Sequence, residues 1–109
     1  NGLGSGWVMV NGQKYTHSIL IDSLVGVLAW PVDTPHTVDE QSFAALAQLD
    51  IEVAQYGSGV SLVFPNPSFL RPLIARNIGL ETMNTAAACR TFNILAGEGR
   101  KVAAALLVV

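Results

Sequence analysis

The sequence feature that most constrains the fold is an uninterrupted apolar run from Val102 to Val109. The run has the length of a β-strand and falls far short of the roughly 20 apolar residues that a membrane-spanning helix needs. Strands with one face in solvent alternate apolar and polar side chains, whereas strands buried on both faces do not. We therefore expect this run to form a strand near the centre of a sheet that is covered on both faces.

Helices that cover this sheet are predicted at three places, and the first two lie in the middle of the chain. Apolar residues recur at helical spacing over residues 38–48, where Thr37 and Glu40 have the spacing of a capping box. Residues 65–77 predict a short second helix that ends near Gly79, because glycine commonly follows the last turn of a helix.

The third helix is the best defined of the three. Asn84 or Thr85 supplies its N-cap, and the helix continues to about residue 96, where Gly97 and Gly99 end it. One side of this helix carries the apolar stripe that is expected to face the sheet, formed by Ala88, Cys89, Phe92, Leu95 and Ala96.

Strand-like segments separate the helices. Asn11-Gly12 is a dipeptide that two-residue hairpin turns prefer, so an N-terminal hairpin is expected. Strands and helices interleave along the chain, which predicts a single α/β domain over residues 1–109, with helices packed on a parallel or mixed sheet. The other segments that we predict as strands are residues 4–10, 13–22, 25–32, 51–56, 60–64 and 80–83.

The composition excludes several classes of function. Half of the 109 residues are apolar and 13% are charged, which argues against disorder. A net charge of −2 without a basic cluster offers no binding surface to nucleic-acid phosphates. One cysteine forms no disulfide within the chain and no cysteine-based zinc site, so a reducing compartment such as the cytoplasm is expected. The chain starts at Asn1 and not at a methionine, so we expect N-terminal residues to be missing. Whether they include a targeting segment is left open.

Cys89 has two interpretations. Its place in the apolar stripe predicts a buried, inert thiol, which is the more frequent state of a free cysteine. A nucleophilic thiolate would need a base such as histidine, and only His17 and His36 occur, both in distant segments. Neither histidine has a partner at the spacing of a local metal site, so no metal and no cofactor is predicted.

The opposite side of the third helix is polar and also has two interpretations. Arg90 and Asn93 lie one turn apart, and Glu98 and Arg100 follow just beyond the helix. A solvated face is the simpler explanation, because most helices carry one. The alternative is a ligand or partner surface, to which an exposed Ile94 would add an apolar contact.

The glycine-rich segments GLGSG and YGSG do not predict phosphate binding. A phosphate loop follows a strand and opens a helix, but residues 2–6 precede a strand and residues 57–59 join two predicted strands. We expect Gly57 and Gly59 to allow a tight bend or a close approach of two backbones.

The segment GLETMNTAAACRTFNILAGEGRKVAAALL, together with NGQKYTHSILI, Trp30, YGSG and FPNP, resembles a family of small domains of unknown function from bacteria and archaea. That family includes the mitochondrial complex I assembly factor 3 proteins and an adipogenesis-associated domain protein. The resemblance implies a three-layer α/β fold whose central mixed sheet has its last strand antiparallel to the others. The resemblance also implies that no enzymatic activity is established. The family's motif positions correspond to Gly57, Gly59, Gly79, Glu81, Thr85, Cys89, Arg90, Asn93, Glu98, Gly99 and Arg100.

Two functions are compatible with the sequence, and the first is favoured. Low charge, the apolar composition and the resemblance favour a non-enzymatic interaction or assembly-factor-like domain that binds protein partners and does not span a membrane. It would act in the cytoplasm or, in a eukaryote, in mitochondria, and homo-oligomer formation stays open. The alternative is a small-ligand-binding domain or an unrecognised enzyme with a polar site near Gly57–Gly59 and Arg90/Asn93. The candidate surface residues are Ser58, Arg90, Asn93, Ile94, Glu98 and Arg100, and the residues expected to be structural are Gly57, Gly59, Gly79, Thr85, Cys89, Phe92 and Gly99.

Overall fold

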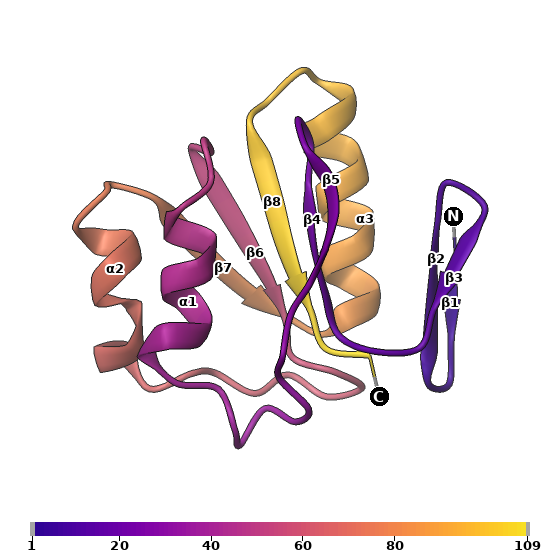
Figure 1. Ribbon diagram of the computed structural model, residues 1–109, viewed down its shortest axis with the longest axis horizontal. Helices are drawn as coiled ribbons and strands as arrows, with labels where there is room; N and C mark the ends of the chain where they lie inside the picture. Colours follow the sequence, from indigo (N-terminus) through magenta and orange to yellow (C-terminus); the bar gives the residue numbers. More distant parts are fainter. Residues whose placement is uncertain (1, 109) are drawn as a thin grey trace.

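The computed structural model describes residues 2–108, which form two β-sheets and the helices packed on them (Figure 1). The larger sheet has five strands in the order β5-β4-β8-β6-β7. The last strand of the sequence lies in the middle of this order, as its apolar run predicts. The five strands are β4 (Ile19–Asp22), β5 (Gly26–Ala29), β6 (Val53–Gly57), β7 (Gly79–Met83) and β8 (Val102–Leu106).

The sheet is mixed, as expected, but the strand that runs against the others is β4 and not the last strand. β8 is antiparallel to β4 and parallel to β6, which is itself parallel to β7. Helix α3 (Thr85–Gly97) connects β7 to β8, and a helical crossover returns the chain in the direction of the strand that it left. Among the strands of this sheet β8 is antiparallel only to β4, so the expectation that the last strand runs against the others is wrong.

β8 has apolar side chains on both faces because both faces are covered. Val102, Ala104 and Leu106 belong to the core cluster on one side of the sheet. Ala103 and Ala105 belong to the cluster on the other side. All five are fully buried, which confirms the doubly covered strand predicted from the sequence.

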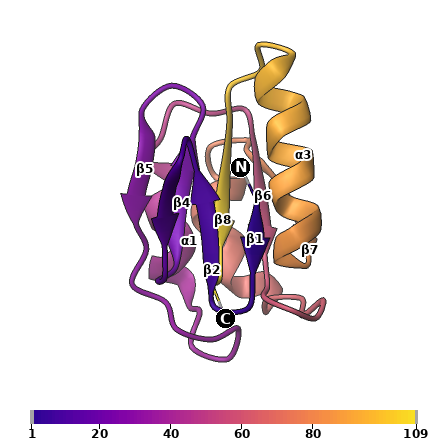
Figure 2. The ribbon, with the colours of Figure 1, turned by 90° about the vertical axis from the view of Figure 1, so that its right-hand side faces the viewer.

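The molecule has three layers, as predicted (Figures 1 and 2). Two helical elements lie on one face of the large sheet, whereas α3 and a small three-stranded sheet share the other face. The small sheet is antiparallel, with the order β1-β2-β3. The remaining elements are β1 (Leu3–Gly4), β2 (Trp7–Val10), β3 (Gln13–Tyr15), α1 (Glu40–Ala47), the 3-10 turn η1 (Pro67–Leu70) and α2 (Arg71–Ile74).

The N-terminal hairpin is confirmed, but the strand predicted after it is divided. Asn11 and Gly12 have φ angles of 51° and 80°, in the left-handed region that a two-residue hairpin turn requires. β3 then ends at Tyr15 in the small sheet, and β4 starts at Ile19 in the large sheet.

Ser18 fixes the point where the chain passes from one sheet to the other. Its carbonyl accepts a hydrogen bond from the Trp30 N–H at 3.1 Å, and its hydroxyl accepts one from the Val108 N–H at 3.2 Å. These partners are distant in sequence, so the periodicity of residues 13–22 gave no sign of the break.

The N-cap of α1 is Asp39, two residues after the predicted cap Thr37. The Asp39 carboxylate accepts a hydrogen bond from the Ser42 N–H at 3.0 Å, and the Ser42 hydroxyl accepts one from the Asp39 N–H at 3.1 Å. Thr37 instead closes the preceding turn, where its hydroxyl donates to the Thr34 carbonyl at 2.9 Å. A carboxylate and not the predicted threonine hydroxyl therefore caps the N-terminus of α1. Its negative charge also interacts favourably with the helix dipole.

The second helix is shorter than predicted and does not end at Gly79. α2 follows η1 and stops at Ile74, and Asn77 adopts the left-handed conformation with φ 55°. The Ile78 N–H donates back to the Leu73 carbonyl at 3.0 Å, which satisfies the helix end. Gly79 is the first residue of β7, so the prediction that it stops the helix is wrong.

α3 agrees with its prediction at both ends. The Asn84 side chain accepts a hydrogen bond from the Ala87 N–H at 2.8 Å, as an N-cap does. At the other end Gly99 has a φ of 79°, and the Arg100 N–H donates to the Leu95 carbonyl at 3.0 Å. This is the Schellman arrangement, which requires a residue in the left-handed conformation. Glycine adopts that conformation without strain.

The two faces of the large sheet have different cores. On the α1 face the rings of Trp30, Phe43 and Tyr56 meet edge to face, with centroids 5.3 to 6.3 Å apart. On the α3 face small residues allow close contact, since a Cβ added to Gly57 would lie 2.9 Å from the Thr85 Cα.

Candidate functional site

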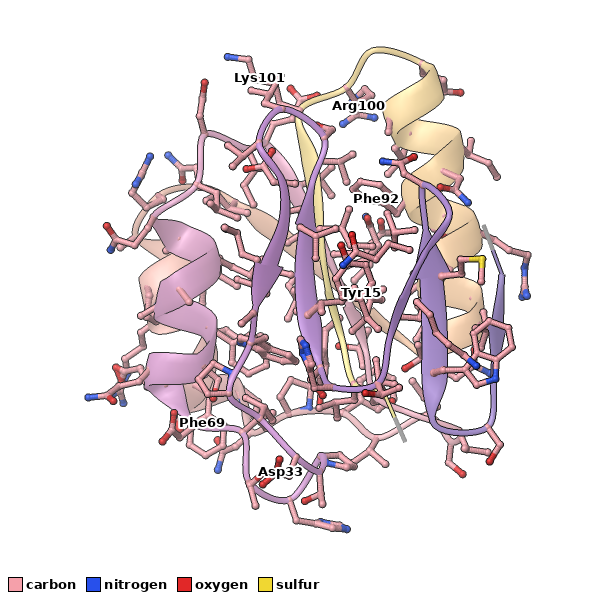
Figure 3. All side chains as sticks on the ribbon, turned by 45° about the vertical axis from the view of Figure 1, so that its right-hand side comes forward. Tyr15, Asp33, Phe69, Phe92, Arg100 and Lys101 are labelled. Atoms are coloured by element: carbon pink, nitrogen blue, oxygen red, sulfur yellow. The ribbon has the colours of Figure 1, made fainter. Side chains whose placement is uncertain are left out.

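A groove of about 660 Å³ lies between α3, the small sheet and the turn that joins β4 to β5, and we name it the α3 groove. Its floor is apolar, because the buried side chains of Val8, Ile21 and Phe92 line it. Figure 3 shows Tyr15 and Phe92 pointing into the space between the small sheet and the large one. The groove therefore lies over a patch of core that neither α3 nor the small sheet covers completely.

The rim of the α3 groove is polar along α3 and along the β2–β3 hairpin, where Asn11 and Gln13 line it, and apolar at the β4–β5 turn. Arg90 and Asn93 line it from α3, and both residues are exposed. Within residues 2–108 Arg90 takes part in no ion pair, and the Asn93 side chain makes no hydrogen bond. On the opposite side Leu24 and Val25 are 61% and 67% exposed. An amphipathic ligand would meet matching chemistry on both sides.

The β4–β5 turn that forms this apolar side is held in place by hydrogen bonds. The buried Asp22 carboxylate accepts hydrogen bonds from the N–H groups of Leu24 at 2.8 Å and Val25 at 3.4 Å. The Ser23 hydroxyl donates to the Arg100 carbonyl at 3.2 Å and accepts from the Val102 N–H at 3.1 Å. The wall of the groove is thus tied to the connection between α3 and β8.

Cys89 also lines the α3 groove and is only half-buried, although the apolar stripe predicts a buried residue. Burial raises the pKa of the Cys89 thiol above its usual value, and the neighbouring Arg90 guanidinium partly opposes this shift. The thiol is consequently neutral near pH 7, which does not favour a nucleophilic role.

A second exposed region joins β6 to η1, and we name residues 58–66 the apolar loop. The sequence predicts a strand over residues 60–64, but these residues pair with no strand of the described chain. Val60, Leu62 and Phe64 are instead 81%, 52% and 71% exposed. Their β-branched and aromatic character predicts a strand, but nothing covers them in residues 2–108.

Ser58 explains why the chain leaves the sheet here. Its buried hydroxyl donates to the Ser61 carbonyl at 2.7 Å and accepts from the Val63 N–H at 2.9 Å. The side chain thus folds the loop back on itself. Ser58 was a candidate surface residue, and the structure places it inside the loop, where it shapes the surface without forming part of it.

Thr85 attaches the apolar loop to the rest of the fold. Its buried hydroxyl donates to the Leu107 carbonyl at 2.8 Å and accepts from the Gly59 N–H at 2.9 Å. Gly59 has a φ of 100°, which favours glycine. Gly57, the last residue of β6, allows α3 to approach that strand. These residues connect the loop, the start of α3 and the end of β8.

The six candidate surface residues do not form one site. Arg90 and Asn93 lie together on the α3 groove, whereas Ile94 is 62% exposed and does not line it. At the far end of α3, Arg100 is paired with Glu52 through a 2.6 Å contact between Nε and Oε1. Glu98 is exposed beside that pair.

Sequence reasoning missed the residues that complete both regions. Tyr15 and Val25 reach the α3 groove from segments more than sixty residues away from Arg90, a juxtaposition that no local pattern records. For the apolar loop a signal existed, because GSGVSLVFPNP places its apolar residues between glycine, serine and proline residues that interrupt strands.

Residues 2–108 contain neither a metal-binding cluster nor a membrane-spanning helix. No group of three or more histidine, cysteine, aspartate or glutamate residues gathers where a metal ion could be held. Over the same residues no helix has the length and apolar character needed to cross a membrane.

Comparison with known proteins gives consistent matches. A family described as "Protein of unknown function (DUF498/DUF598)" matches residues 1–107. NADH dehydrogenase [ubiquinone] 1 alpha subcomplex assembly factor 3 from Bos taurus is 36% identical over 83 residues, which cover 74% of this chain and 45% of that protein. The chain spans about half the length of the curated relatives that it matches.

Solved structures share the fold. A crystal structure of a Bordetella parapertussis protein matches with a TM-score of 0.94 and 36% identity, over 100% of this chain and 93% of that one. A Mth938-like domain from Bordetella pertussis, solved by NMR, matches with a TM-score of 0.83 and 34% identity, over 96% of this chain and 82% of that one.

Proposed function

Because the chain belongs to the family described as "Protein of unknown function (DUF498/DUF598)", and because relatives 31% to 36% identical to it are named as NADH dehydrogenase assembly factors, we propose that it is a non-enzymatic, assembly-factor-like domain that binds a protein partner. The observation that carries this proposal is the apolar loop. A partner protein would cover its exposed side chains as part of an interface. The domain would act in the cytoplasm or, in a eukaryotic host, in mitochondria.

Three apolar side chains in one short loop are unusual on a protein surface. Val60, Leu62 and Phe64 alternate along the loop, and each residue is more than half exposed. Single exposed apolar residues are common, but a group of them marks a site of interaction. Aromatic residues such as Phe64 are enriched at protein interfaces.

The loop is also held in shape before any partner arrives. Hydrogen bonds from Ser58 and Thr85 fix its backbone at the start, and Asn66 fixes its end by accepting from the Ser68 N–H at 3.0 Å. A preorganised loop loses less conformational entropy on binding than a flexible one. The arrangement therefore suits recognition of a partner.

The proposal is tested by affinity capture of the protein from its own host after mild cross-linking, with mass spectrometry as the readout. We expect a stoichiometric protein partner for the unchanged chain. The double variant Leu62→Ser/Phe64→Ser should lose most of that partner, because the substitutions remove apolar surface without touching the core.

The matched control is Ile74→Ser, which changes a side chain that is 66% exposed on α2. This variant should retain the partner, and all three proteins should melt at the same temperature. Capture of the same partner in equal amounts by the double variant would show that the apolar loop is not the contact surface. The absence of any stoichiometric partner would remove the proposal itself.

A further inference from the structure

The α3 groove has a chemical character of its own, which does not depend on a protein partner. Its volume of about 660 Å³ lies within the roughly 300–1,000 Å³ range of small-molecule sites. Such sites combine an apolar lining with a few polar groups that orient the ligand. Both components are present here.

The polar component of the groove is a positive charge that no carboxylate of the described residues pairs with. Arg90 lines the groove and forms no ion pair within residues 2–108. The Arg100 guanidinium, at the end of the same helix, is paired with Glu52. Arginine binds a carboxylate through two parallel hydrogen bonds, and the Asn93 amide one turn away adds a further donor.

The apolar component lies next to this charge. Val8, Ile21 and Phe92 form the floor, and the exposed side chains of Leu24 and Val25 stand on the far rim. An alkyl chain placed between them would remove its own apolar surface and that of Leu24 and Val25 from water, above a floor that offers it no polar group. The distribution matches a molecule with one anionic end and one apolar end.

One acidic residue lines the same groove and bears on the choice of ligand charge. Asp22 is 3% exposed, and one of its carboxylate oxygens accepts hydrogen bonds from the N–H groups of Leu24 and Val25. Its charge is thus engaged in shaping the β4–β5 turn. Arg90, by contrast, is exposed and available to a ligand.

We propose that the α3 groove binds a linear monocarboxylate, with the carboxylate on Arg90 and Asn93 and the alkyl chain over Val8, Ile21 and Phe92. A single arginine fits a single negative charge, which favours a monoanion over a multiply charged phosphate ester. The half-buried, neutral thiol of Cys89 adds no competing charge to the groove.

The test is an NMR titration of the ¹⁵N-labelled protein with decanoate, kept below the concentration at which micelles form. We expect saturable shifts of the amides of Tyr15, Cys89 and Phe92. The uncharged 1-decanol should bind at least several-fold more weakly, and decylammonium should not compete. Shifts confined to the apolar loop would overturn the proposal, since they would show adsorption to exposed apolar surface.

Variants of the polar rim test the charge directly. Arg90→Gln should weaken decanoate binding by about tenfold or more, because a charged hydrogen-bonded pair is lost. Arg90→Lys should recover part of the affinity by restoring the charge without the two-pronged geometry. The matched control is Arg71→Gln, which removes an exposed arginine on α2 and should leave affinity unchanged.

Three results would contradict the proposal: no saturable binding, equal affinity for decanoate and decylammonium, or unchanged affinity in Arg90→Gln. A short peptide with a free carboxyl terminus that binds the groove more tightly than every linear carboxylate would also replace it. Binding of decanoate with no protein partner in capture experiments would support this site while removing the proposed function, so the two proposals are tested independently.

Discussion

The two faces of the large sheet are covered in different ways, although they share the same five strands. The α1 face is closed by helices over a cluster of aromatic rings, with Phe43 and Tyr56 completely buried. The α3 face is shared by one helix and a small sheet, and the groove remains between them. Adjacent residues of β6 show the contrast, because the Tyr56 ring fills the core on the first face, whereas Gly57 lets the backbone of α3 approach on the second.

The two faces should contribute differently to the stability of the domain. Large rings in edge-to-face contact make a continuous core that tolerates little change. On the other face small residues let α3 lie close to the large sheet at one end of the helix. The α3 groove remains accessible between α3 and the small sheet. Substitutions on the α1 face should therefore affect stability, and those near the α3 groove should affect it less.

The largest effect is expected from Phe43→Ala, which should lower the free energy of unfolding by about 3–5 kcal/mol. Phe43 is 0% exposed and contacts both Trp30 and Tyr56 through ring edges. Phe92→Ala should cost clearly less, because one side of Phe92 borders the groove and has fewer contacts to lose. Urea unfolding of both variants measures the difference, and equal losses would contradict the contrast between the faces.

Gly57→Ala should cost about 1–3 kcal/mol by overpacking the α3 face. The added Cβ would lie 2.9 Å from the Thr85 Cα and 3.1 Å from the Ala88 Cβ, so α3 must move. Gly79→Ala is the control, since a Cβ there meets nothing within 4 Å. The control should unfold within about 0.5 kcal/mol of the unchanged protein. A Gly57→Ala variant as stable as that control would show that α3 adjusts freely.

Cys89→Ala should lower stability by about 1 kcal/mol, the scale of a small deletion beside a core. Burial raises the pKa of the thiol, so labelling of native Cys89 by iodoacetamide at pH 7 should be slower than labelling in urea. Arg90→Gln should slow it further, because the guanidinium lowers this pKa. Labelling at equal rates in the native and unfolded states would show that Cys89 is fully accessible.

Tyr56→Phe should have the smallest effect, between no change and a gain of about 1 kcal/mol. The Tyr56 hydroxyl is buried without a hydrogen-bond partner in residues 2–108, so its removal abolishes a desolvation cost. Burial raises the pKa of Tyr56 from 10.0 to about 12. The folded state therefore holds this proton more tightly, and the associated stability is present below pH 10 and is lost as the pH rises to about 12.

Urea unfolding between pH 8 and pH 12 checks this sign (roughly two pH units on either side of the ordinary tyrosine pKa). The unchanged protein should lose more stability across the upper half of that range than Tyr56→Phe does. Parallel curves for the two proteins would mean that the Tyr56 hydroxyl finds a partner or solvent in the folded state.

The sequence predicted best where local chemistry decides the outcome. Asn11-Gly12 and the Asn84 cap each depend on interactions within a few residues, and the structure contains both. The run from Val102 predicts a central strand because apolar residues at consecutive positions indicate burial on both faces. The family resemblance added the three-layer arrangement, which local patterns leave open.

Two failures, at Ser18 and at the α3 groove, occurred where distant contacts decide, whereas the failure at Ser58 has a local cause. Ser18 ends one sheet and starts another through partners at residues 30 and 108. Ser58 turns a strand-like segment into a loop, and its hydrogen bonds outweigh the β-propensity of residues 60–64. The α3 groove combines side chains from the first and last thirds of the chain, so most of its lining is absent from the candidate residues.

The central position of β8 also determines when this protein can fold during its synthesis. β4 and β5 emerge from the ribosome early and β6 and β7 later, yet neither pair can join the other without the strand between them. Translation makes that strand after all the other described strands. Until then the nascent chain exposes two strand pairs with open edges, which are the kind of surface that chaperones bind. Folding of the sheet is therefore completed only after β8 has left the ribosome.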